Sequence, residues 1–82
     1  MSTTAELFWS NLNRWKKYHG FTRSELERQI NYRIGGLKIL EKRGSIPHPR
    51  VIDKLVNAFG IEHIEMFTSW TDEEWEKVIG GE

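Results

Sequence analysis

The apolar residues of this chain recur three and four positions apart, which is the spacing of one face of a helix. In residues 5–20, Phe8, Leu12 and Trp15 form one such stripe, and Gly20 follows as a natural end of the helix. No segment shows the strict alternation of apolar and polar residues that is typical of a strand. The pattern therefore predicts an all-α fold.

Two helices are predicted in the middle of the chain. Thr22 and Glu25 have the spacing of a capping box, in which each side chain accepts a hydrogen bond from the other residue's backbone amide, so a helix should begin at about residue 23. Asn31 and Tyr32 then leave room for a tight turn only. The next helix should follow directly and end at about Lys42.

The second half of the chain predicts three more helices. Residues 44–49 contain Gly44, Pro47 and Pro49, which break helical hydrogen bonding, and Pro49 suits a first helical position. The predicted helices cover about residues 49–59, 63–68 and 71–80. We therefore expect a compact five-helix bundle over residues 1–69, and an acidic C-terminal extension with a short helix over residues 70–82.

Gly35 and Gly36 fall inside the predicted third helix, in the stretch NYRIGGLKILEKRG. Each glycine in a helix interior costs roughly 1 kcal/mol relative to alanine. The pair therefore needs a structural or functional reason.

Composition narrows the possible functions. A chain of 82 residues without cysteine has no disulfide framework and no thiolate metal site, and its three histidines are scattered. No apolar run approaches the roughly 20 residues of a membrane span, and the first residues lack the layout of a signal peptide. No pair of nucleophile and base stands out. We expect a cytoplasmic protein that is not an enzyme and uses no metal or small-molecule cofactor.

The formal net charge of zero hides an uneven distribution. Residues 14–54 contain eleven Lys and Arg against four acids, whereas residues 55–82 contain one lysine against seven acids. A cationic segment of this kind is typical of a protein that binds a polyanion. A solvated surface with chance clustering of charge is the simpler alternative.

The central helices and their flanks resemble the DNA-binding domain of the phage repressor and Cro family, the xenobiotic-response-element type of helix-turn-helix protein. The similarity covers about residues 10–68 without a gap. The residues in register with the family pattern are Thr22, Glu25, Leu26, Tyr32, Leu37, Leu40, Glu41, Pro47, Leu55, Ala58, Gly60, Ile61 and Phe67. The resemblance implies a repressor-like bundle whose third helix enters the major groove of duplex DNA, usually as a homodimer.

Four positions depart from that pattern, one of them the family's glycine after Glu41, which is displaced by one position to Gly44. Arg23 replaces a glutamine that contacts phosphate in the family, and the extra charge should preserve this role. Glu27 replaces a small alanine between the second and third helices, which predicts looser packing there. Asn31 replaces the glycine of the turn and tolerates a left-handed conformation better than other non-glycine residues.

The resemblance also suggests the residues that would contact DNA. Carrying over the family's reading positions gives candidate base contacts at the start of the third helix. These are Arg33, Ile34, Gly35, Gly36, Lys38 and Ile39. The candidate phosphate contacts are Arg23, Lys42, Arg43 and Arg50.

Glycine offers no side chain to a base edge, so three explanations for the glycine pair remain open. The glycines could allow close approach to DNA, with Arg33 and Lys38 reading bases while Ile34 and Ile39 touch thymine methyl groups. The helix could instead bind phosphates and DNA shape. Alternatively, the apolar surface could bind another protein, in which case the domain would be an adaptor or antitoxin-like interaction module with weak or no specific DNA binding.

Four tryptophans are many for a chain of this length. Trp15 lies on the apolar stripe of the first helix and should be buried, whereas Trp9 lies off it. Trp70 and Trp75 lie beyond the region of resemblance and are candidate dimer contacts. The sequence thus predicts a transcription regulator that binds double-stranded DNA as a homodimer in the nucleoid.

Overall fold

The computed structural model describes residues 3–80 and confirms the all-α class. Residues 1–2 of the predicted bundle and residues 81–82 of the predicted C-terminal extension lie outside the described residues. The helices are α1 (Thr4–His19), α2 (Arg23–Gln29), α3 (Gly36–Arg43), α4 (Pro49–Phe59), the 3-10 helix η1 (His63–Met66) and α5 (Asp72–Gly80). None of them is long and apolar enough to cross a bilayer.

The helix ends follow local sequence signals. Thr3 with Glu6, Thr22 with Glu25, and Thr71 with Glu74 form capping boxes at the starts of α1, α2 and α5. Left-handed glycines close α1, α3 and α4. At the start of α4 the Nδ1 atom of His48 accepts a hydrogen bond from the Arg50 amide at 3.1 Å. The predicted first helical position of Pro49 is confirmed.

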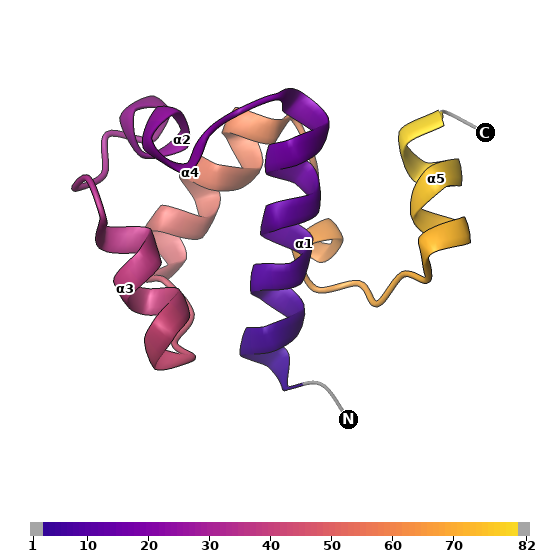
Figure 1. Ribbon diagram of the computed structural model, residues 1–82, viewed down its shortest axis with the longest axis horizontal. Coiled ribbons are helices and arrows are strands. Elements are labelled where there is room, and N and C mark those ends of the chain that lie inside the picture. The colour runs from indigo at the N-terminus through magenta and orange to yellow at the C-terminus, as the bar shows by residue number, and fades with distance from the viewer. Residues whose placement is uncertain (1–2, 81–82) are drawn as a thin grey trace.

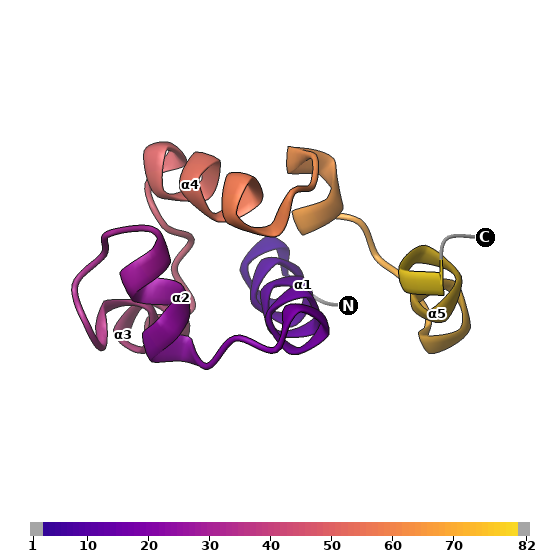
Figure 2. The same ribbon diagram turned by 90° about the horizontal axis from the view of Figure 1, so that it is seen from above.

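The core lies where α4 meets α1, α2 and η1. Apolar side chains from every helix of the bundle are buried there, among them Phe8, Leu12, Leu26, Leu37, Leu55 and Met66. Figure 1 shows α1 in the middle of the molecule, with α2 and α3 together on one side of it. The view from above in Figure 2 has the same order. The bundle therefore presents α2 and α3 as a pair at one end.

α5 lies at the opposite end of the long axis from α2 and α3 (Figures 1 and 2). An aromatic contact attaches it to α1, since the ring of Trp75 meets the ring of Trp15 edge-on at 4.7 Å between centroids. The guanidinium of Arg14 lies over the Trp75 ring, donates to the Trp70 carbonyl at 3.0 Å and pairs with Asp72. The C-terminal segment is thus anchored within its own chain.

The structure corrects two predictions about side chains in the bundle. Trp9 is buried although it lies off the main stripe, and its Nε1 donates to the Ser45 carbonyl at 2.9 Å. Glu27 does not loosen the packing between α2 and α3, because the residue is 1% exposed and its carboxylate is hydrogen-bonded to the backbone. A buried carboxylate with two donors is compatible with tight packing.

Candidate nucleic-acid interface

The connection between α2 and α3 is longer than the sequence predicted. α3 begins at Gly36 and not near Arg33, so that six residues, 30–35, separate the two helices. A helix-turn-helix connection typically has about three to four residues. The prediction of a helix starting just after Tyr32 was therefore wrong, and Arg33, Ile34 and Gly35 lie in the turn.

Asn31 ends α2 in the left-handed conformation that the sequence predicted, with φ of 56°. Its amide donates to the Arg28 carbonyl at 3.1 Å, and the Tyr32 amide donates to the Glu27 carbonyl at 2.7 Å. This pair of hydrogen bonds is the Schellman arrangement, which satisfies the last carbonyls of a helix. The chain thus leaves α2 in a defined direction.

The two glycines have different structural reasons, and neither lies in a helix interior. Gly35 is the N-cap of α3 with φ of 85°, a left-handed conformation that glycine adopts without strain. Gly36 is the first residue of the helix and is buried under the ring of Tyr32, where an added Cβ would lie 2.5 Å from a ring carbon. Sterics and backbone conformation therefore explain both glycines without reference to a ligand.

Because Gly35 has no side chain to cap α3, a carboxylate from α2 takes that role. Glu27 accepts hydrogen bonds from the amides of Gly35 at 3.0 Å and Leu37 at 3.1 Å. The Gly36 amide between them donates to the Arg33 carbonyl at 2.9 Å. Negative charge is favourable at a helix N-terminus, and a hydrogen bond to a charged group contributes roughly 1.5–3 kcal/mol.

Arg23, a candidate phosphate contact, is directed inward. Its guanidinium pairs with Glu41 of α3, and both side chains are about 30% exposed. Glu41 also accepts from the Asn13 side chain of α1 at 3.4 Å. This link joins α1, α2 and α3, and it compensates much of the Arg23 charge.

The other candidate contacts are more accessible. Lys38, Ile39, Lys42 and Arg43 lie on the exposed side of α3, while Leu37 is buried beneath them. In the turn, Arg33 is exposed, and so is Arg50 at the start of α4. Ile34 is 59% and Ile39 is 45% exposed, which is unusual for isoleucine. Gly36, in contrast, is buried and has no side chain to offer a base edge.

Ion pairing leaves the basic segment with excess positive charge. Of the eleven Lys and Arg in residues 14–54, Arg14 and Arg23 form ion pairs within the described residues 3–80. The four acids of the same segment all have internal partners: Glu25 in its capping box, Glu27 on α3, Glu41 with Arg23, and Asp53 with His63. The exposed cations of α2, α3 and the start of α4 are therefore largely uncompensated.

The candidate dimer contacts Trp70 and Trp75 are half-buried against α1 of the same chain. The rings of Trp70 and Trp75 also contact each other, at 5.3 Å between centroids. Their aromatic surface is thus used largely within one molecule.

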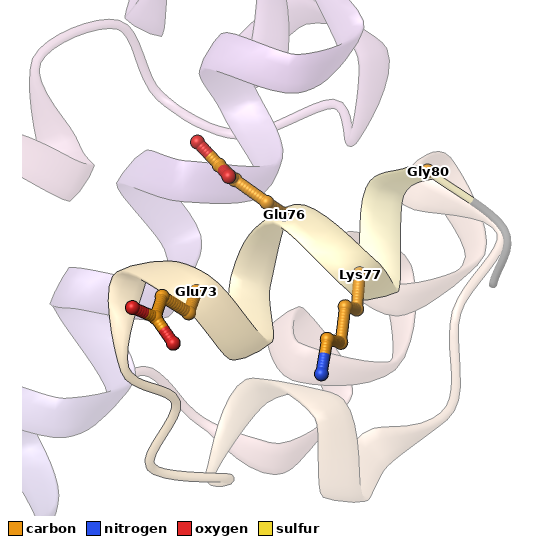
Figure 3. A pocket seen from close by; sticks show the side chains of 4 residues that line it. All are labelled: Glu73, Glu76, Lys77 and Gly80. Carbon is orange, nitrogen blue, oxygen red and sulfur yellow. The ribbon is translucent and has the colours of Figure 1, made fainter.

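Shallow hollows lie on the surface of the described part of the chain. Figure 3 shows one of them, lined by Glu73, Glu76, Lys77 and Gly80 of α5, where Glu76 points away from Glu73 and Lys77. Residues 3–80 also contain no group of three His, Asp or Glu side chains arranged to hold a metal ion.

Sequence reasoning missed the role of Glu27, although one signal was present. Glu27 lies three positions before the buried Ile30, so helical periodicity places it on the inward face of α2. A carboxylate on a buried face needs hydrogen-bond donors, so this position indicated a contact inside the protein.

Comparison with known proteins gives no further assignment: no family model, curated protein or solved structure matches this chain significantly.

Proposed function

We propose that the protein binds duplex DNA as a small regulator, through the turn after α2 and the exposed side of α3. The observation that supports this proposal best is the uncompensated charge. Every acid of the basic segment has an internal partner, whereas Arg33, Lys38, Lys42 and Arg43 are exposed without ion pairs in residues 3–80. Such a surface attracts phosphates through the release of condensed counterions.

The residues differ in the contacts that they could make. Arg33 and Lys38 can donate to base edges, of which guanine O6 and N7 are the usual acceptors. Ile34 and Ile39 can contact thymine methyl groups. Lys42, Arg43 and Arg50 would bind phosphates, and Arg23 would contribute less because it is paired with Glu41. Binding of two half-sites would require a homodimer, which is part of the proposal.

A selection from a randomised duplex pool, at low and near-physiological salt, tests this proposal. We expect the selection to enrich a specific sequence. If the protein binds as a dimer, that sequence should be a palindrome with half-sites about ten base pairs apart. Lys38→Ala should weaken retention, whereas Lys77→Ala, the matched change on α5, should not. Absence of retention at both salt concentrations would contradict DNA binding.

A second candidate function rests on the exposure of Ile34 and Ile39. Contiguous exposed apolar surface marks protein-binding sites, and Ile34 and Ile39 expose large apolar side chains five positions apart in the sequence. Under this alternative the pair would contact a partner protein as an adaptor or antitoxin does. Substituting both isoleucines by serine would then abolish partner binding. The wild-type protein would not be retained on DNA even at low salt.

A further inference from the structure

Glu27 is a charged side chain that the proposed DNA contacts do not use. It is 1% exposed and lies on the inward face of α2, between the buried residues Leu26 and Ile30. Burying a carboxylate is costly unless donors compensate it. Its position therefore requires a structural or functional reason.

The hydrogen bonds of Glu27 connect α2 to both ends of the following turn. Its carbonyl accepts from the Tyr32 amide where the turn begins, at 2.7 Å. Its carboxylate accepts from the Gly35 and Leu37 amides where α3 begins, at 3.0 and 3.1 Å. One residue thus fixes where the turn starts and where it ends.

Tyr32 and Gly36 complete this arrangement. The Tyr32 ring lies over Gly36 so closely that an alanine at that position would overlap it. Gly35 adopts the left-handed conformation from which its amide donates to the carboxylate of α2. The residues between these fixed points include Arg33 and Ile34, both exposed.

We propose that Glu27 is a positioning residue for DNA recognition: its carboxylate fixes the start of α3 against α2, and thereby the orientation in which Arg33, Ile34 and Lys38 meet base edges. This inference rests on the proposed function. Base readout requires side chains held in a defined geometry, whereas phosphate attraction tolerates variation. Loss of the carboxylate should therefore affect sequence preference more than general affinity for DNA.

The test compares Glu27→Gln and Glu27→Ala with the wild type and with Phe8→Leu, a destabilising core change in α1, where the Phe8 ring contacts Trp9 and Phe67. Two quantities are measured at a temperature where every variant is folded by circular dichroism. The first is hydrogen exchange at the Gly35 and Leu37 amides. The second is the affinity ratio between the duplex enriched by selection and the same duplex with one base pair changed.

We expect the Gly35 and Leu37 amides to exchange faster in Glu27→Ala than in Phe8→Leu. Glu27→Gln should be intermediate, because its amide retains one acceptor oxygen and turns an NH₂ group toward the other donor. The affinity ratio should fall roughly tenfold in Glu27→Ala, the effect of losing about one base contact, while the salt dependence of binding stays as in the wild type. Phe8→Leu should keep the full ratio.

Three results would overturn the inference. Unchanged exchange at Gly35 and Leu37 in both Glu27 variants would show that the carboxylate does not hold α3. An affinity ratio equal to that of the wild type in Glu27→Ala would show that the carboxylate does not orient Arg33, Ile34 and Lys38. If the alanine variant does not fold, the ratio of Glu27→Gln decides this point. An equal fall of the affinity ratio in Phe8→Leu would show that the effect of the Glu27 substitutions comes from lost stability alone. Failure of the wild type to retain any duplex would contradict the proposed function itself, and the exchange data alone would then decide whether Glu27 fixes the helix.

Discussion

Gly35 and Gly36 are neighbours in the chain, but different constraints act on them. Gly35 requires a left-handed backbone, with φ of 85° and open space where a Cβ would lie. Gly36 has no positive φ, and the Tyr32 ring occupies the space of its Cβ instead. The first glycine is thus explained by conformation and the second by packing.

Gly36→Ala should therefore destabilise the protein, although Gly→Ala at a helical position normally stabilises by about 0.4–1 kcal/mol. Displacing Tyr32 is an overpacking change, for which we expect a cost of about 1–3 kcal/mol in the free energy of unfolding. Urea denaturation measures this, with Gly80→Ala as the control, since Gly80 is helical and has open space around its Cβ position. A Gly36→Ala variant as stable as Gly80→Ala would show that the Tyr32 ring moves aside freely.

At the scale of the elements, three helices begin with the same device. In each capping box a threonine hydroxyl accepts from the glutamate amide, and the glutamate carboxylate accepts from the threonine amide. Hydrogen bonds from the backbone and side chain of Thr3, Thr22 and Thr71 lower the pKa of Glu6, Glu25 and Glu74 respectively. The charged form of each glutamate is therefore favoured in the folded state.

A lowered pKa makes this stabilisation dependent on pH. The contribution is fully present above the ordinary glutamate value of about 4.5, and it is lost as the pH falls through the lowered values of the folded state. Glutamine can still form a capping box but does not titrate in this range. The triple variant Glu6→Gln, Glu25→Gln, Glu74→Gln should therefore lose less stability than the wild type between pH 6 and about pH 3. Thermal denaturation across this range measures it, and parallel losses in the two proteins would contradict the assignment.

The helices that sequence analysis located well are those with local signals. Thr22 and Glu25 are three residues apart, and Pro49 and Gly60 mark the ends of α4 within their own neighbourhood. The start of α3 was misplaced because its cap comes from Glu27, eight and ten residues before the amides that it binds. A contact at that separation depends on the packing of two helices, which periodicity alone does not provide.

For the candidate interface too, the sequence predicted local features but not contacts between distant residues. The excess of Lys and Arg in residues 14–54 is visible in the sequence, but the pairing of Arg23 with Glu41 is not, because it joins α2 to α3 across 18 positions. The packing of Trp75 on Trp15 likewise joins residues 60 positions apart. Composition thus indicated the charge, and tertiary contacts decided which charges and aromatic rings are available.

Across the whole molecule, charge of opposite sign lies at opposite ends. The exposed cations of α2 and α3 lie at one end of the long axis, and α5, with Asp72, Glu73, Glu74 and Glu76, lies at the other (Figure 1). A charge distribution of this kind orients a protein as it approaches a polyanion. We therefore expect DNA to contact the α2 and α3 end while α5 points away from it.

Amide chemical-shift mapping with a 20-base-pair duplex at low salt tests whether DNA binds at the α2 and α3 end. We expect the amide chemical shifts of residues 28–43 and Arg50 to change with added DNA, while those of α5 stay constant, and we expect raised salt to reverse the changes. Changes centred on α5, or no change at any ratio of DNA to protein, would contradict it.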